Sequence, residues 1–546
     1  MVTRSVALAA FVAAAPLTAM AQSALPTPVE TAALRELDAW SVSAIARNEG
    51  ALPADLWARS DPAFLAAALD KLPAVYDSAA MQNLARRVLF SGGDAPRGDT
   101  QAAARKRFEA IGRMGAADQL ATMVAGSGTS ASDPIIAQYG AQAELARGRR
   151  NEACARGRNA AAVDAPPPFL LRLRAYCAAA GGDRAAADLA LELARAQNAE
   201  DAWYTGAVAA AGGAPGARPP AARWDNSLAV QLSLAGQLRP GPNPLANSST
   251  LALVALARSD TTPQPMRAQA AALAFRRDVI GPREARVILS ATPAEVTSAL
   301  PPIVVALRRI QAAAPAAGAP ANPAGPSAAE VTGAAIADVL RQSTAPADFA
   351  AAARFFREEI NALQVAPDAA AAVLYARAAI SNGDVQVSNR LVASARQAGA
   401  TEAALAPLDA ALAVMAGVRN DSGAMAMQRR IDAGGASGAR AAARDVAILA
   451  ALGAPMNGTV QTFLLANPPQ GGARADAGAM LALAASAERG ALGEGAVLAV
   501  AAAGEAGPAR LDADSLDRLI RALRALRLED DARRVAVEAL LAGAPS

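Results

Sequence analysis

The two cysteines are the residues whose type and spacing most directly suggest chemistry. Cys154 lies in "RRNEACARGR" and Cys177 in "RAYCAAAGG", on the next expected helix. A redox-active pair needs a C-x-x-C spacing or a thiolate at a helix N-terminus, and neither pattern is evident. In an oxidising compartment, an even pair of cysteines on neighbouring helices most simply forms one disulfide. We therefore predict a structural Cys154–Cys177 disulfide, with a reactive pair favoured by the nearby arginines as the alternative.

Missing residue types restrict the catalytic classes open to this chain. The sequence has no histidine, which excludes Ser-His-Asp and Cys-His machinery and histidine zinc sites. Neither of the two lysines follows a glycine, so the chain has no P-loop. The acidic pairs Glu358-Glu359 and Asp530-Asp531 are adjacent on expected helices, so their side chains point in different directions and we expect solvated faces. We predict no enzyme activity, no cofactor and no metal site.

Aromatic and arginine side chains concentrate in one short region. Such residues are typical of the anchors of protein interfaces. This candidate binding surface consists of Phe169, Arg172, Arg174, Tyr176, Trp203, Tyr204 and Trp224. The alternative is that the aromatic side chains fill the core where alanine is scarce, with the arginines on a solvated rim. The sequence leaves both interpretations open.

The pattern of apolar residues predicts the elements that carry these side chains. Apolar positions recur three and four residues apart between short breaks of Gly, Pro, Asp or Ser, which is typical of helices. Apolar residues make up 53% of the chain but aromatic ones only 3%. Small side chains let helices pack closely without filling a wide core. We predict an all-α fold, a right-handed superhelical solenoid of antiparallel helix pairs stacked in sequence order.

Two segments have small and larger apolar packing residues at matching positions around a Gly-Asp turn. The first set, around Gly182-Asp183, is Ala175, Ala187, Leu191 and Ala194, and the second, around Gly383-Asp384, is Ala376, Ser388, Val392 and Ala395. Small residues let the two helices of a hairpin approach, and glycine closes the turn. These segments resemble degenerate tetratricopeptide-like (TPR/SEL1-type) repeats. The resemblance implies a bacterial periplasmic α-solenoid.

Composition also predicts the domain boundaries. Residues 1–21 have a basic start, an apolar core and a small-x-small end, which predicts a signal peptide cleaved before Gln22 and export to the periplasm. The stretch 313–328 is rich in Pro, Ala and Gly and predicts a linker that no helix crosses. It separates an N-terminal helical-repeat arm, 22–312, from a C-terminal arm, 329–546, that ends in capping helices.

These expectations favour a protein that works by binding. The net charge of +3 does not favour nucleic acid as a partner, and no stretch after the signal peptide is long and apolar enough to span a membrane. Our leading hypothesis is a periplasmic scaffold or adaptor for another envelope protein or complex, in cell-wall synthesis, secretion and assembly, or the flagellar motor. The alternative is a peptidoglycan-directed enzyme or glycan-binding accessory, because soluble lytic transglycosylases are similar in having a long alanine-rich superhelix.

Overall fold

The structure is a computed structural model that describes residues 37–160, 166–214, 218–296, 300–313, 326–364 and 366–543. The predicted signal peptide and its cleavage site lie outside the described residues. Within them the chain is α-helical, and the only β-type pairing is one isolated bridge between Ala473 and Leu511. The predicted all-α class is confirmed. Among the described helices, none combines the length and apolar character that crossing a bilayer requires.

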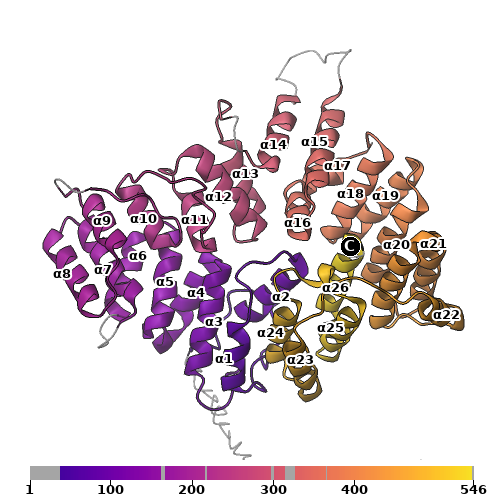
Figure 1. Ribbon diagram of the computed structural model, residues 1–546, viewed down its shortest axis with the longest axis horizontal. Helices are drawn as coiled ribbons and strands as arrows, with labels where there is room; N and C mark the ends of the chain where they lie inside the picture. The colour runs from indigo at the N-terminus through magenta and orange to yellow at the C-terminus, as the bar shows by residue number, and fades with distance from the viewer. Residues whose placement is uncertain are drawn as a thin grey trace, which may run out of the picture. The chain divides into compact units, whose positions relative to one another are not determined.

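The helices follow one another along the whole described chain (Figure 1). Before residue 314 they are α1 (Pro62–Asp70), α2 (Ala79–Phe90), α3 (Gln101–Met114), α4 (Ala117–Gly126), α5 (Pro134–Ala146), α6 (Arg150–Ala160), α7 (Pro168–Ala180), α8 (Arg184–Ala196), α9 (Ala202–Ala211), α10 (Ser227–Ala235), α11 (Thr250–Arg258), α12 (Gln264–Arg276), α13 (Pro282–Ser290) and α14 (Pro302–Ala313). After residue 325 they are α15 (Ala328–Gln342), α16 (Pro346–Phe355), α17 (Arg357–Ala362), α18 (Ala369–Ser381), α19 (Val385–Gln397), α20 (Glu402–Ala416), α21 (Asp421–Ala451), α22 (Gly458–Ala466), α23 (Ala477–Arg489), α24 (Leu492–Ala503), α25 (Ala513–Ala525) and α26 (Glu529–Ala542). Short 3-10 helices span Arg47–Glu49, Gly128–Ser132 and Pro508–Arg510.

Local sequence signals set the helix ends. The side chains of Asp61, Ser78, Asp183 and Asp368 accept hydrogen bonds from the first-turn amides of α1, α2, α8 and α18. These caps satisfy N–H groups that have no partner inside the helix. Within α21 the chain folds back at Gly435, whose φ of 54° few other residues adopt. This reversal brings Arg430 Nε within 2.6 Å of Asp445 Oδ2.

Helices adjacent in sequence pack as pairs. Contacting neighbours include α5 with α6, α7 with α8, α11 with α12, α18 with α19, α20 with α21, and α23 with α24. Both segments with the tetratricopeptide-like pattern form such pairs, α7–α8 and α18–α19. Their turns contain Gly182 at φ 81° and Gly383 at φ 76°. The helix pairing is therefore as predicted and is compatible with a helical-repeat solenoid.

The predicted linker, 313–328, lies mostly outside the described residues. The helices on its two sides, α14 and α15, pack against each other, and Arg309 Nη1 lies 2.7 Å from Asp338 Oδ2. Helices α12 and α16 are also in contact across this boundary. Residues of both predicted arms thus share packed contacts, while the division into two arms stays a prediction.

The last helices of the described chain pack against the first. Helix α24 contacts α1 and α2, and α26 contacts α2, α18 and α20, so that α2, α24 and α26 lie side by side in Figure 1. We call this contact of α1 and α2 with α24 and α26 the terminal junction. These helices are more than 400 positions apart in the sequence. For example, the Asp61 amide, just before α1, donates to the Glu494 carboxylate of α24, and the two residues are 433 positions apart.

Backbone hydrogen bonds and close packing hold the terminal junction together. The Gly493 amide at the start of α24 donates to the Leu56 carbonyl at 2.9 Å, and the Asp77 amide donates to the Glu505 carbonyl at 2.9 Å. A Cβ on Gly493 would lie 2.5 Å from the Trp57 ring, well inside van der Waals contact. Only glycine therefore lets the two chain segments approach this closely.

A buried arginine fixes the N-terminal part of the terminal junction. Arg107 of α3 is fully buried, and its guanidinium donates hydrogen bonds to the carbonyls of Ala39, Leu89 and Ser91 at 2.7, 2.9 and 2.8 Å. The rings of Trp40 and Trp57 lie 5.6 and 5.4 Å from the guanidinium carbon. Leu89 and Ser91 are at the C-terminal end of α2, where carbonyls lack partners within the helix. Arg107 therefore caps α2 and links it to residues 39 and 40.

Candidate functional site

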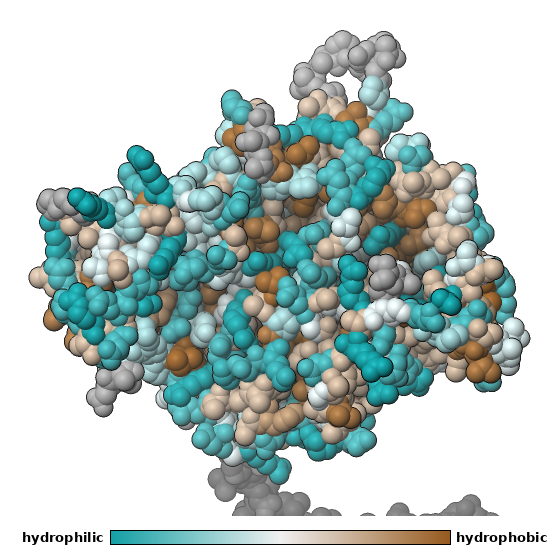
Figure 2. Space-filling model, viewed as in Figure 1, coloured by the Kyte–Doolittle hydropathy of each residue, from teal (hydrophilic) through white to brown (hydrophobic). Residues whose placement is uncertain are grey.

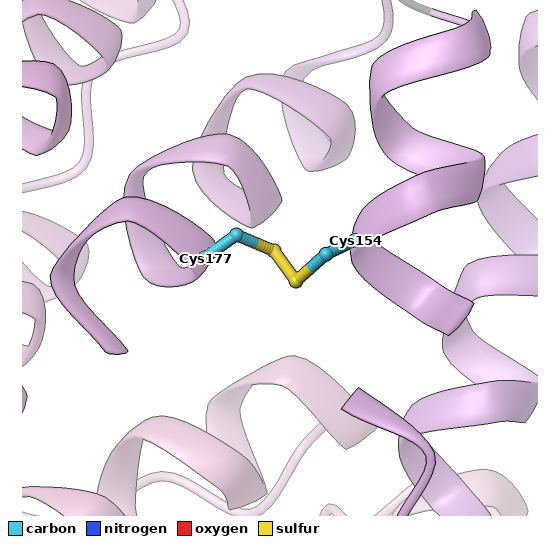
Figure 3. The surroundings of a disulfide bond; sticks show 2 residues. All are labelled: Cys154 and Cys177. Carbon is cyan, nitrogen blue, oxygen red and sulfur yellow. A yellow bond between two sulfur atoms is a disulfide. The ribbon is translucent and has the colours of Figure 1, made fainter. Parts of the chain in front are cut away.

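The two cysteines face each other between α6 and α7 (Figure 3). Their Cα atoms are 5.9 Å apart, which is a normal separation for a disulfide, and the structure contains the Cys154–Cys177 bond. Cys154 lies on α6 and Cys177 on α7, so the bond joins the α5–α6 pair to the α7–α8 pair. The geometry agrees with the structural disulfide predicted from the sequence.

Alkylation will test this disulfide. We expect both thiols of the unreduced, denatured protein to resist a maleimide reagent, because both sulfurs are in the bond. Reduction is expected to lower the free energy of unfolding by about 3 kcal/mol, since the closed loop restricts the unfolded chain. Full labelling without reductant would contradict the prediction. A Cys154→Ala/Cys177→Ala double variant, measured with and without reductant, is the matched control.

Four of the five aromatic residues of the candidate binding surface are core residues. The side chains of Tyr176, Trp203, Tyr204 and Trp224 are all buried. Trp203 Nε1 donates to the Ala221 carbonyl at 2.7 Å, so its polar atom is satisfied inside the protein. The rings of Trp203 and Tyr204 pack edge to face at 4.9 Å. These contacts favour the core interpretation for the four aromatic side chains, while a binding role for the region stays a prediction.

The remaining members of that surface lie at its rim. Arg172 stacks on the Tyr204 ring at 4.6 Å and donates to the Ala199 carbonyl at 3.1 Å. Phe169 and Arg174 are half-buried. The structure therefore brings Arg172 and Tyr204 together, but it leaves only the arginines and Phe169 accessible to a partner.

An apolar groove lies beside the disulfide. It has a volume of about 340 Å³ between α6, α7 and α8. The disulfide and Leu173 contribute to its lining, and Leu189 and Leu193 of α8 border it with 63% and 40% of their surface exposed. Leu189 and Leu193 are four positions apart on α8, so they lie about one helical turn apart. On the face drawn in Figure 2, apolar side chains lie in groups among hydrophilic ones.

A larger pocket opens beside the terminal junction. Its volume is about 700 Å³, and α2, α16, α18 and α26 supply most of its lining. The charged side chains that line it are Asp278, Arg354, Arg377, Asp530, Arg533, Arg534 and Glu538. Because these residues come from four distant parts of the sequence, the pocket exists only when the terminal junction is formed. We call it the junction pocket.

Three residues of the junction pocket carry unpartnered polar atoms, and one of these atoms, Arg354 Nε, belongs to a guanidinium that donates to the Phe275 carbonyl through Nη2. Arg377 Nε and Glu538 Oε1 are buried without a hydrogen-bond partner among the described residues. The other carboxyl oxygen of Glu538 accepts from the Ala80 amide at 2.8 Å. Neither Arg377 nor Glu538 belongs to a site predicted from the sequence, although each is the only charged residue within an apolar run, "VLYARAAI" and "VAVEALLAG". A lone charge in such a run was the available signal.

Glu538 makes stability depend on pH. Burial raises its pKa from 4.5 to about 7, with the hydrogen bonds from Ser78 and Ala80 as smaller opposing effects. The folded state therefore binds this proton more tightly than the unfolded state, and the free energy of unfolding falls as the pH rises from 4.5 to about 7. The slope is at most about 1.4 kcal/mol per pH unit.

A Glu538→Gln variant tests this assignment. Glutamine retains an oxygen for the Ala80 amide but does not titrate, so we expect denaturant unfolding of the variant to lack the Glu538 contribution to the slope. The charged groups that share the pocket with Glu538 are those named above, and they are unchanged in the variant. An identical pH profile for the two proteins would show that folding does not shift the pKa of Glu538.

The adjacent acidic pairs do not all lie on solvated faces. Asp531 is buried and pairs with Arg87 of α2, and Glu359 pairs with Arg286 at 2.7 Å. The expectation was wrong for Asp531 because the packing of α26 on α2 places an arginine opposite it. Glu358 and Asp530 are exposed as expected. Among the described residues, no group of three or more Asp, Glu or Cys side chains is arranged to hold a metal ion.

The fold defines the class of this protein as an all-α chain of packed helix pairs. The chain matches no protein-family model, no curated protein and no solved structure. The type of repeat therefore rests on the two segments described above.

Proposed function

We propose that this chain is an exported, tetratricopeptide-like scaffold that binds another protein of the bacterial envelope. In this proposal it is a right-handed superhelical solenoid with two arms, and it works in the periplasm. The observation that supports it is the succession of helix pairs whose contact faces carry small buried residues, such as Ala175 and Ala376. Stacked pairs of this kind present extended surfaces suited to protein partners.

The apolar groove beside the disulfide is the part of the surface that best fits a partner. Leu189 and Leu193 offer apolar contact area, and Arg158 and Arg174 lie on the same groove. A partner segment with an apolar residue flanked by acidic ones would complement both features. Cell-wall synthesis, secretion and assembly, and flagellar motor complexes are the envelope machines in which we expect such a partner.

Crosslinking in intact cells followed by affinity purification tests this function. We expect a specific envelope protein to be recovered, and a Leu189→Asp variant to recover it at least about tenfold less well, because the aspartate is unfavourable in an apolar contact. Leu481→Asp is the matched control, since Leu481 on α23 is 71% exposed and distant in sequence from the groove. Both variants are expected to unfold within about 0.5 kcal/mol of the unmodified protein.

Two results would contradict the scaffold proposal. One is equal recovery of the partner by the Leu189 and Leu481 variants, which would exclude the groove. The other is recovery of no specific envelope protein while the purified chain releases muropeptides from isolated sacculi. That second result would establish the peptidoglycan-directed alternative.

A further inference from the structure

The junction pocket has the size and the chemistry of a small-molecule site. Its volume of about 700 Å³ is within the range of ligand pockets, about 300 to 1,000 Å³. We propose that it binds a small organic molecule that carries a carboxylate or phosphate group on an apolar body. This inference is independent of the proposed scaffold function, because it concerns a different region of the chain.

Arg377 is the group that would bind the oxyanion. The other three arginines of the pocket already have partners: Arg354 donates to the Phe275 carbonyl at 2.6 Å, Arg533 pairs with Asp530, and Arg534 donates to Asn83 Oδ1 at 2.6 Å. Within the described part of the chain, Arg377 makes no hydrogen bond or ion pair, and its guanidinium carbon lies 4.2 Å from the centre of the Phe349 ring.

The contact with Phe349 gives this guanidinium a defined orientation. A ring stacked on one face holds the plane of the group and leaves its N–H donors at the edge free. Two parallel donors at that edge match the two oxygens of a carboxylate or phosphate. Burial lowers the pKa of Arg377 with no carboxylate opposing it. An anion in the pocket would supply the missing charge partner and offset this desolvation.

Glu538 supplies a second hydrogen-bond donor, on an uncharged group. Its Oε2 is occupied by the Ala80 amide, so a proton on the neutral carboxyl group lies on the buried, unpartnered Oε1. That O–H can donate to an oxygen of the ligand. Ile380, Met415 and Val537 line the same pocket and provide apolar surface for the rest of the molecule. The two polar groups and this lining together define the ligand class.

Isothermal titration of the purified full chain with succinate, and separately with inorganic phosphate, tests the proposal. Ionic strength is held constant with chloride, because exposed charges attract anions non-specifically and salt screens that effect. We expect at least one of the two probes to bind, Arg377→Gln to weaken it at least about tenfold, and Arg377→Lys to weaken it less. The matched control is Arg309→Gln, an arginine outside the pocket that pairs with Asp338.

Absence of binding by the unmodified chain to either probe up to about 10 mM would overturn the proposal. An equal loss for the Arg377 and Arg309 variants would also overturn it, because the attraction would then be non-specific. If Arg377→Gln does not fold, hydrogen exchange of the unmodified chain with the bound probe decides the question. Slower exchange in α18 and α26 supports the junction pocket, and slower exchange confined to other helices refutes it.

Discussion

Replacing Arg107 with methionine is expected to lower the free energy of unfolding by about 3 to 6 kcal/mol. Methionine fills similar space but offers no donor, so the carbonyls of Ala39, Leu89 and Ser91 would stay buried without partners. Each unsatisfied buried acceptor costs about 1 to 3 kcal/mol. The contacts with Trp40 and Trp57 would lose their cationic partner as well. Denaturant unfolding followed by circular dichroism measures the change.

Two substitutions control this result. Arg107→Lys keeps the charge but cannot present the same planar set of donors, so we expect an intermediate loss. Arg105→Met, on the same helix, removes the pair of a partly exposed arginine with Asp133, whose carboxylate keeps the Ile135 and Ile136 amides as donors, and should cost about 1 kcal/mol. Equal effects of the Arg105 and Arg107 variants would mean that the buried hydrogen bonds do not hold α2 and α3 in place.

Replacing Gly493 with leucine is expected to open the terminal junction. The Cβ alone would lie 2.5 Å from the Trp57 ring and 2.8 Å from the Leu56 carbonyl oxygen, and position 493 is fully surrounded by protein. Overpacking of this kind typically costs about 1 to 3 kcal/mol, and we expect the upper end or more because one clash is with backbone. Loss of the Gly493–Leu56 hydrogen bond adds to this cost.

Limited proteolysis and hydrogen exchange distinguish local opening from global unfolding. In the Gly493→Leu variant we expect faster exchange in α1, α2 and α24 before the other helices are affected. Gly478→Leu is the matched control, because Gly478 is exposed on α23 and its nearest neighbour is the Asp476 side chain at 3.4 Å. Unchanged exchange at α2 and α24 in the Gly493 variant would show that the terminal junction tolerates a side chain there.

The pH dependence that Glu538 gives to stability requires an intact terminal junction. Helix α26 carries Glu538 and packs against α2, whose first turn supplies the Ala80 amide. Opening the junction would therefore expose Glu538 to water and remove the burial that raises its pKa. The Gly493→Leu variant is expected to lose the Glu538 contribution to the pH profile, which a thermal or denaturant series across neutral pH would show.

Local features of this protein were predictable because they depend on neighbouring residues. The helix period, the capping residues and the Gly-Asp turns at Gly182 and Gly383 act within a few positions, and the structure has the paired helices that they predict. The cysteine pairing was also accessible, because Cys154 and Cys177 lie on consecutive helices. A pattern of small residues identifies which helix faces touch, but it does not identify distant partners.

By itself, then, the sequence determined the all-α class, the helix pairs and the placement of Cys154 beside Cys177. Only the tertiary structure decided that α24 and α26 return to α1 and α2, that Arg107 is buried among carbonyls, and that Arg377 and Glu538 line one pocket. The physical reason is that a helix end or a turn is selected by short-range sterics and hydrogen bonding. The packing of segments more than 400 positions apart depends instead on shape and polar complementarity between whole surfaces, such as the glycine at position 493 opposite Trp57.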